Sequence, residues 1–291
     1  MEPTLIPALV AMGGLGALLA GGLAFADRKL RVEEDERIGE VLGVLPGANC
    51  GGCGLAGCQD FAVNVVAGQK EVTGCPVGGP DVAAEVARIL GVEAGESIRL
   101  VARVLCRGAS GLAQVKASYV GPDSCSAKAL VGGGDKACLY GCLGGGDCVE
   151  ACQFDAIFMD EQGLPQVMDV LCTGCGACVK ACPRDIIELH PEDRELFVFC
   201  RNHDDPRTAR KVCAVACIGC AICAKKSNGA IAMKDNLAVI DYARLDPGII
   251  PLEKCSTKAI GFLRPPVSAS ATGVPPVAAA QGTSVDGEAT V

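Results

Sequence analysis

Two cysteine runs lie in residues 138–182, which read CLYGCLGGGDCVEACQFDAIFMDEQGLPQVMDVLCTGCGACVKAC. The second run holds Cys172, Cys175, Cys178 and Cys182 at C-x2-C-x2-C-x3-C spacing, and a proline follows it. The first run holds Cys138, Cys142, Cys148 and Cys152 in the same order, with two wider gaps. Glycines separate the thiols in both runs, so the backbone can turn its amides toward the sulfurs. The sequence therefore predicts two loops that present thiolates to metal centres.

Two-cluster ferredoxins bind [4Fe–4S] clusters with this spacing, and the fourth cysteine of each run ligates the cluster of the other run. One predicted ligand set is therefore Cys138, Cys142, Cys148 and Cys182. The second set is Cys172, Cys175, Cys178 and Cys152. Tetrahedral zinc is the alternative, because it also uses C-x2-C pairs. Three evenly spaced cysteines and a fourth before proline are a poor zinc pattern.

The composition fits a chain held together by metal–sulfur bonds. Hydrophobic residues make up 50% of the 291 residues, but aromatic residues only 3%, and tryptophan is absent. Glycine (38) and cysteine (20) are abundant instead, as expected where metal sites staple small loops. Disulfides would need an oxidising compartment, so we predict reduced thiolates in the cytoplasm. A net charge of −8 and a pI near 4.9 argue against a nucleic-acid partner.

An uncharged apolar segment, Leu5–Ala26, is long enough to cross the roughly 30 Å hydrocarbon core of a bilayer as a helix. Positive charges follow it at Arg28, Lys29 and Arg31, which places the rest of the chain on the cytoplasmic side of the cell (inner) membrane. A cleaved signal peptide is one alternative, because residues 24–26 read AFA, but Glu2 and the lack of Lys or Arg before the segment are wrong for it. A buried helix of a soluble protein is the other. We expect an uncleaved single-pass anchor.

Cys50, Cys53, Cys58 and Cys75 form a C-x2-C-x4-C-x16-C group. Glycines separate the first three thiols, and Phe61–Val66 has the pattern of a helix that returns the chain to Cys75. The arrangement predicts one [4Fe–4S] cluster in a small helical domain. It is similar to the four-iron domain of two families, the B subunit of Rnf complexes and the large subunit of the corrinoid iron–sulfur protein.

An apolar pair follows the last cysteine of each run at offsets four and five. The pairs are Ala156-Ile157 after Cys152, Ile186-Ile187 after Cys182, and Ala259-Ile260 after Cys255. We expect a short β-hairpin at each pair. Repetition of this kind indicates a duplicated ferredoxin-like unit.

The third run keeps Cys217, Cys220 and Cys223, but Ser227 stands at the position of its fourth cysteine. Under crossed ligation that missing thiol would serve a cluster whose other three ligands lie upstream of Cys255, and those three are missing as well. The two losses agree, so we expect one cluster, bound by Cys217, Cys220, Cys223 and Cys255. Ser256 replaces the usual proline after the last of these.

Four cysteines then remain, Cys106, Cys125, Cys200 and Cys213. Twenty cysteines would fill five sites of four, and these residues would make the fifth. Their spacing does not itself support a site, and buried free thiols are the alternative. We therefore expect three to five [4Fe–4S] clusters.

The predicted fold is α+β, with a transmembrane helix, a small helical cluster domain and ferredoxin-like (βαβ-hairpin) units. The predicted boundaries are an anchor at 1–27, the N-terminal [4Fe–4S] domain at 28–80, a connecting region at 81–135, a two-cluster ferredoxin-like domain at 136–190, a second ferredoxin-like domain at 191–263 and a tail at 264–291. The tail is rich in Pro, Ala, Ser and Gly, which predicts disorder.

A basic group accompanies the third run, at Arg207, Arg210, Lys211, Lys225 and Lys226. Such a group is usually a solvated surface. On an acidic protein it could also steer the docking of an acidic ferredoxin. Lys225 and Lys226 are the candidates for that role.

The whole chain to about residue 263 resembles the B subunit of the Rnf ion-translocating ferredoxin:NAD oxidoreductase family. The resemblance rests on the N-terminal span and on NCGGCGLAGC, DKACLYGCLGGGDCVEACQFDAI, CTGCGACVKACPRDII, CIGCAIC and DNLAVIDY. It implies a membrane complex with other subunits, both membrane-embedded and flavin- and nicotinamide-bearing. In such a complex this chain would receive electrons from soluble ferredoxin and pass them on, and the energy would move Na⁺ or H⁺.

No catalytic residue is predicted in this chain. There is no G-x-G-x-x-G after a strand, no P-loop, and no carboxylate pair or Ser/His arrangement for acid–base work. The two histidines, His190 and His203, have no ligand-like spacing, so we expect them in turns or on the surface. The available chemistry is one-electron transfer. An iron–sulfur subunit of another membrane complex or a corrinoid-activating protein, and a zinc-stabilised scaffold, are the alternatives.

Overall fold

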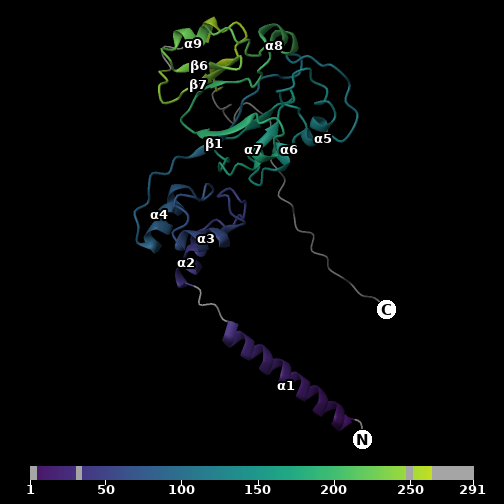
Figure 1. Cartoon of the computed structure of the whole chain (residues 1–291), viewed down its shortest axis with the longest axis vertical. Helices are drawn as coiled ribbons and strands as arrows, with labels where there is room; N and C mark the ends of the chain where they lie inside the picture. Colours follow the sequence, from purple (N-terminus) through teal and green to yellow (C-terminus); the bar gives the residue numbers. More distant parts are fainter. Residues whose placement is uncertain (1–4, 31–34, 247–251, 264–291) are drawn as a thin grey trace, which may run out of the picture. The chain divides into compact units, whose positions relative to one another are not determined.

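The structure is a computed structural model that describes residues 5–30, 35–246 and 252–263 (Figure 1). The chain divides into two compact units, residues 1–99 and residues 100–291. This division falls inside the region 81–135 that we expected to be a connection. The disorder expected for residues 264–291 concerns a segment outside the described residues.

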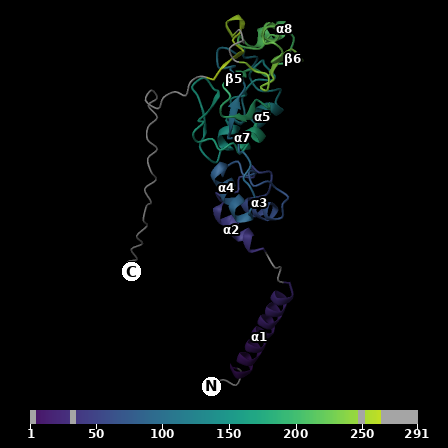
Figure 2. The ribbon, with the colours of Figure 1, turned by 90° about the vertical axis from the view of Figure 1, so that its left-hand side faces the viewer.

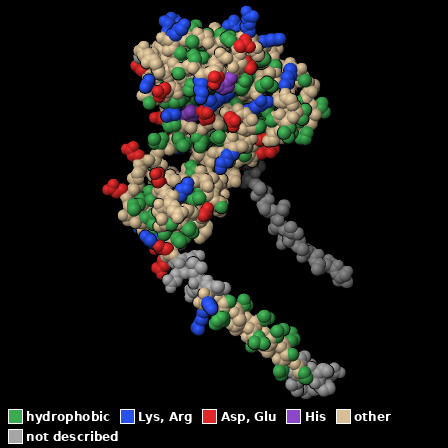
Figure 3. All heavy atoms as spheres, viewed as in Figure 1, with side chains coloured by type: hydrophobic (Ala, Val, Ile, Leu, Met, Phe, Trp, Pro, Cys, Tyr) green, Lys and Arg blue, Asp and Glu red, His purple; other side chains and the backbone are tan. Residues whose placement is uncertain are grey.

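The N-terminal apolar segment forms one helix, α1 (Leu5–Leu30), drawn unbroken in Figures 1 and 2. Residues Val10–Lys29 of this helix have a mean hydropathy of 1.5, and none of that window is buried in the protein. Hydrophobic side chains and bare backbone cover its length, and Lys and Arg side chains appear only near one end (Figure 3). By length and composition, α1 is a candidate membrane span.

Three helices follow in the first unit: α2 (Glu36–Val44), α3 (Cys58–Val66) and α4 (Gly79–Leu90). The Asp35 side chain caps α2 by accepting a hydrogen bond from Arg37 N, and Gly91 ends α4 in the left-handed conformation. Their apolar faces meet around Phe61, whose side chain is 1% exposed, with Val41 and Val86 beside it. This core is small, and it packs directly against the loops that carry the first four cysteines.

Within residues 100–246 and 252–263, the second unit has four antiparallel pairs of short strands. They are β1 (Leu100–Val104) with β4 (Ile187–Pro191), β2 (Ile157–Met159) with β3 (Pro165–Val167), β5 (Leu196–Val198) with β8 (Ile260–Phe262), and β6 (Ile231–Lys234) with β7 (Leu237–Ile240). The same plan therefore occurs twice. In each half the first strand pairs with the last, and a hairpin lies between them.

Strands begin where the apolar pairs predicted them, but two of the expected hairpins are wrong. β2, β4 and β8 each begin five residues after a cysteine. Only β2 continues into a hairpin; β4 and β8 pair with β1 and β5, which lie far upstream. Sequence offsets locate a strand, whereas its partner is chosen by the long-range closure of each half.

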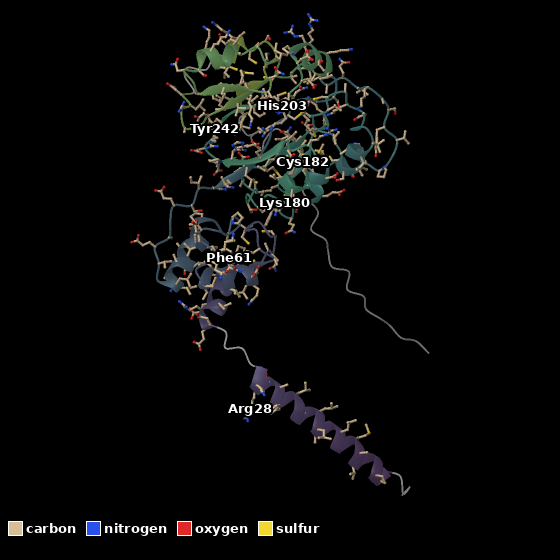
Figure 4. All side chains as sticks on the ribbon, viewed as in Figure 1. Arg28, Phe61, Lys180, Cys182, His203 and Tyr242 are labelled. Carbon is tan, nitrogen blue, oxygen red and sulfur yellow. The ribbon has the colours of Figure 1, made fainter. Side chains whose placement is uncertain are left out.

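The two halves meet at an aromatic cluster. His190 of β4 packs edge-on against Phe197 of β5, with 5.0 Å between ring centroids, and lies 5.7 Å from the ring of Tyr242. Burial lowers the pKa of His190 to about 4, and the positive charges of Arg194 and Arg103 contribute to this shift. The imidazole is therefore neutral at pH 7. His190 is thus a core residue rather than a turn or surface one. Figure 4 labels Tyr242 and also His203, which bonds Asp235 O through Nδ1 at 3.0 Å.

Three cysteine loops share one backbone path, and each leads into a short helix: α6 (Asp147–Glu150), α7 (Ala177–Ala181) or α9 (Ile222–Lys226). In each loop a glycine with positive φ stands two positions after a cysteine: Gly144 after Cys142, Gly174 after Cys172 and Gly219 after Cys217. The helix N-caps, Gly146, Gly176 and Ala221, also have positive φ. This common path aligns the three loops residue by residue. The remaining helices, α5 (Cys125–Leu130), α8 (Pro206–Val212) and the 3-10 turn η2 (Leu252–Lys254), lie in the connections.

Gly174→Ala should destabilise the second unit more than Gly132→Ala does. Both glycines have positive φ, +68° and +59°, so each substitution carries the same conformational strain of about 1 kcal/mol. A Cβ at Gly174 would also lie 2.5 Å from the backbone oxygen of Leu100 in β1, whereas one at Gly132 meets nothing within 4 Å. Overpacking of this kind costs roughly 1–3 kcal/mol more. Thermal melts under anaerobic conditions check the order, and equal melting temperatures would contradict it.

Candidate metal centres

The first unit gathers four sulfurs at one site. Cys50, Cys53, Cys58 and Cys75 line a single cavity together with Phe61 of the core. The Asn49 side chain, whose backbone has φ of 47°, accepts a hydrogen bond from Cys58 N at 2.8 Å and so closes the loop onto the start of α3. Gly52 N donates to Cys50 Sγ at 3.5 Å. The predicted set is therefore brought together, with a backbone amide directed at a sulfur.

The structure brings Cys152 close to Cys178 of the second run, the pair that crossed ligation would need. Burial, then the thiolates of Cys172, Cys175 and Cys152, raises the pKa of Cys178 to about 12. Ala102 N in β1 donates to Cys172 Sγ at 3.5 Å, and Ala156 N donates to Cys152 Sγ at 3.4 Å. Cys182, which Figure 4 labels at the end of α7, belongs to the neighbouring group instead.

In that neighbouring group Cys148 lies close to Cys125 and Cys182, and Cys142 lies close to Cys125. Burial raises the pKa of Cys148 to about 12, and the negative charges of the nearby thiolates Cys125, Cys182 and Cys178 add to this shift. We expected Cys138 in this set, but the cysteine that lies near Cys142 and Cys148 is Cys125, whereas Cys138 lines a different cavity. The alignment of the loops gives the reason: Cys142, Cys148 and Cys152 correspond to Cys172, Cys178 and Cys182, each thirty residues later. Gly145 then stands where the second run has Cys175.

Cys125 reaches the empty position at Gly145 from a separate helix. A Cβ on Gly145 would lie 2.3 Å from Cys125 N, so only glycine leaves room for the start of α5. The Asp147 carboxylate accepts from Cys125 N at 2.5 Å, from Ser126 N at 3.0 Å and from Ser126 Oγ at 2.7 Å. Burial opposes ionisation of Asp147, but these bonds outweigh it and lower its pKa. Asp147 therefore positions Cys125, a role that cysteine spacing does not reveal.

A further cavity is lined by Cys106, Cys138, Cys200 and Cys213. A Cβ on Gly108 would lie 3.5 Å from Cys106 Sγ and 3.6 Å from Cys213 Sγ. One on Gly141 would lie 3.5 Å from Cys138 Sγ and 3.9 Å from Cys106 Sγ. The sulfurs thus face the same space. Cys138 lines this cavity where we expected Cys125.

We call this cavity the central site, because both ferredoxin-like halves contribute to it, and in the same way. Cys106 and Cys200 each stand two residues after a first strand, and Cys138 and Cys213 each stand four residues before a cysteine loop. Cys106 Sγ accepts from Gly108 N at 3.4 Å and from Cys142 N at 3.5 Å. Cys200 Sγ accepts from Asn202 N at 3.4 Å and from the backbone of Cys217. Duplication of one half therefore explains the central site, two thiols from each copy.

The structure brings the three cysteines of the third run together with Cys255. Cys217, Cys220, Cys223 and Cys255 line one cavity, and Cys220 is exposed. Ser227 lies at the fourth position but is 4% exposed and fully bonded: its Oγ donates to Ala224 O at 3.1 Å and accepts from Ile231 N at 2.9 Å. Cys152 accepts from the residue at the same offset, Ala156. Ser227 has kept the structural bond of that cysteine without its thiol.

The geometry fits cubane clusters better than single metal ions. A zinc ion needs its sulfurs about 2.3 Å from one point. In the described part of the chain, no three His, Cys, Asp or Glu side chains converge in that way. Twelve of the cysteines line three small cavities, and N–H groups point at several of the sulfurs, as in iron–sulfur proteins. Burial raises the pKa of Cys142 and of Cys200 to about 12, so without iron these thiols stay protonated.

Comparison with known proteins gives the family. A family model described as "4Fe-4S dicluster domain" matches residues 137–186, and one described as "Putative Fe-S cluster" matches residues 45–77. The chain is 44% identical over 250 residues to the B subunit of the Na(+)-translocating ferredoxin:NAD(+) oxidoreductase complex of Acetobacterium woodii, covering 86% of this chain and 75% of that protein. It is 38% identical over 261 residues to the B subunit of the ion-translocating oxidoreductase complex of Methanosarcina acetivorans, covering 89% of this chain and 99% of that one. The B subunit of the proton-translocating complex from Clostridium ljungdahlii is 39% identical over 242 residues, which are 82% of this chain and 85% of that one. The chain therefore belongs to the family of B subunits of ion-translocating ferredoxin:NAD oxidoreductase (Rnf) complexes.

Proposed function

We propose that this chain is a membrane-anchored relay of five [4Fe–4S] clusters, which takes electrons from reduced ferredoxin and passes them to the other subunits of an Rnf complex. That complex would couple ferredoxin:NAD oxidoreduction to movement of Na⁺ or H⁺. The observation that carries the proposal is that twelve of the twenty cysteines line three cavities in fours, while the other eight lie close to one another in the second unit. Family membership supports the same interpretation.

The proposed ligand sets follow the geometry rather than the spacing alone. They are Cys50, Cys53, Cys58 and Cys75; Cys152, Cys172, Cys175 and Cys178; Cys125, Cys142, Cys148 and Cys182; Cys106, Cys138, Cys200 and Cys213; and Cys217, Cys220, Cys223 and Cys255. A bound cluster supplies reversible one-electron storage. The chain's own residues hold it with thiolates, direct N–H groups at the sulfurs and exclude water.

Contacts between sets give an order for the four sites of the second unit. Cys220 marks the exposed end. Its set touches the central site through Cys200, which accepts from the backbone of Cys217. The central site touches the next set through Cys142 N, which donates to Cys106 Sγ. Cys148 and Cys178 join that set to the last one. Electrons would move along this line one at a time.

The exposed end carries the basic group and is the proposed docking surface for ferredoxin. Figure 3 shows Lys and Arg side chains at the edge of the molecule that holds α8 and α9. Lys225 and Lys226 end α9, and contact with Lys226 lowers the pKa of Lys254. No described carboxylate forms an ion pair with these three lysines. A surface of like charges beside an exposed cluster favours an acidic redox protein.

The chain is proposed to cross the membrane once, with both cluster-binding units on the cytoplasmic side. Arg28 and Lys29 lie in the last turn of α1, and no Lys or Arg precedes the apolar segment. The positive-inside rule gives the orientation from this asymmetry.

Paired cysteine substitutions should separate the proposed ligand sets from the spacing-based ones. The full-length protein, purified without oxygen, should contain about twenty iron atoms per chain, four for each cluster. Cys106→Ala and Cys138→Ala remove ligands of one cluster, so the double variant should lose about four iron atoms, as each single variant does. Cys138→Ala with Cys182→Ala should lose about eight.

The spacing-based sets give the opposite pattern for these doubles. If Cys138 and Cys182 shared a cluster, their double variant would lose no more iron than either single one. Acid-labile sulfide should fall together with iron. A colourless protein with no iron would end the proposed function as a whole.

Lys226→Gln, and more strongly Lys225→Gln with Lys226→Gln, should slow reduction of the clusters by ferredoxin. Removing positive charge weakens steering of an acidic partner, and the effect should shrink as salt rises. Stopped-flow bleaching at low and high ionic strength measures both. Lys116→Gln is the control, because its exposed side chain bonds Gly132 O away from α9. Equal rates for all variants at low salt would remove the docking surface.

Fusions at the C-terminus should report the orientation. Green fluorescent protein should fluoresce there, and alkaline phosphatase should stay inactive, because the end of the chain remains in the cytoplasm. Moving the positive charges before the apolar segment, by Arg28→Gln and Lys29→Gln with two lysines added after Met1, should weaken or reverse that result. An active phosphatase on the unaltered chain would contradict the orientation.

A further inference from the structure

We propose that Lys136 and Asn202 raise the reduction potential of the cluster at the central site, so that an electron crossing between the two ferredoxin-like halves rests there. The inference builds on the proposed function, which supplies the cluster. It concerns what two of the chain's own side chains do to that cluster. Neither residue is a predicted ligand.

Lys136 and Asn202 are the two positions at which the halves contribute different side chains to the central site. Gly108 and Asn202 occupy matching positions, two residues after Cys106 and Cys200. Lys136 and Lys211 also match, two residues before Cys138 and Cys213. Lys211 is exposed, however, whereas Lys136 is 8% exposed. One half therefore contributes a buried lysine and the other a buried amide, each without a counterpart.

Lys136 brings a positive charge to the sulfurs. Its side chain lines the same cavity as the four cysteines, and Nζ donates to Gly108 O at 3.0 Å. A Cβ on Gly108 would lie within 3.6 Å of Cys106 Sγ and Cys213 Sγ. No described carboxylate pairs with Lys136 Nζ, and the backbone around it is fixed by the bridge between Val115 and Lys136. The charge is thus held in place and directed at this site.

Asn202 adds a side-chain hydrogen bond to a ligand. It is 0% exposed, and Nδ2 donates to Cys138 Sγ at 3.6 Å. Its Oδ1 accepts from Asp204 N at 2.6 Å, which fixes the orientation of the amide. Asn202 N donates to Cys200 Sγ. One residue therefore links a ligand of each half.

The electrostatics follow from the direction of charge transfer. Reduction adds one electron and no proton to a cluster already bound by four thiolates, so the reduced form is the more negative one. A buried cation and N–H donors stabilise that form more than the oxidised form, and the potential rises. Arg201 also lines the cavity, but its guanidinium contacts the Glu188 carboxylate. Lys136 is therefore the cation whose charge is not offset.

Redox titration followed by electron paramagnetic resonance tests the proposal on the full-length protein, purified without oxygen. Lys136→Gln should lower one midpoint potential by at least a tenfold change in the reduction equilibrium, or about 59 mV, and leave the others unchanged. Lys136→Arg should keep the original midpoint. Lys211→Gln, the symmetry-related lysine, is the matched control and should shift nothing. Cys138→Ala identifies the component, because its signal should disappear.

Each result decides the matter. An unshifted midpoint in Lys136→Gln overturns the proposal, and so does an equal shift in Lys136→Arg, because packing rather than charge would then be responsible. If Lys136→Gln loses iron, Asn202→Leu replaces it, since it removes the donor to Cys138 without adding a charge. A shift to lower potential supports the proposal, and no shift overturns it. Absence of cluster signals in the unaltered protein would instead defeat the proposed function.

Discussion

Four sulfurs must stand around one small cavity, and the rest of the structure follows from that requirement. The strands that the structure describes in the second unit occur only in pairs, which are marginal on their own in water. The cysteines make up much of the buried interior, where Cys142, Cys148, Cys172 and Cys178 lie among Ile157, Ile186 and Ile187. Metal–sulfur bonds would therefore supply cohesion that large side chains supply elsewhere.

Much of this arrangement was predictable from the sequence because the cluster loops are local. The spacing of Cys50 to Cys75 and of Cys217 to Cys255 predicted sets that the structure brings together. Ser227 in place of a fourth cysteine predicted that the third run lacks one ligand. In the structure the Ser227 hydroxyl is used in two hydrogen bonds to the backbone. Local backbone geometry, set by positive φ at Gly174 and Gly219, links spacing to structure in these loops.

The exchange of Cys125 and Cys138 was not predictable from cysteine spacing. Aligning cysteine with cysteine treats Cys138 as the first ligand of its run. Aligning Cys142 with Cys172 instead places Gly145 opposite Cys175, so Gly145 marks the position that lacks a cysteine. The sequence contains the basis for this alignment, because Cys148 and Cys152 follow Cys142 at the same distances as Cys178 and Cys182 follow Cys172. That Cys125 fills the vacancy depends on Asp147 holding α5, a contact between residues 22 positions apart. Pairing of β1 with β4 and of β5 with β8 is long-range in the same sense.

Duplication then explains why a site exists between the halves at all. A single half provides only two thiols to the central cavity, one after its first strand and one before its loop, and two thiols cannot enclose a cubane. The second copy completes the set. It also places Cys142 N on Cys106 Sγ and Cys217 near Cys200, so the completed site touches a cluster loop of each half. Because the proposed central site is shared, departures from symmetry there, at Lys136 and Asn202, would act on the cluster proposed to lie between the halves.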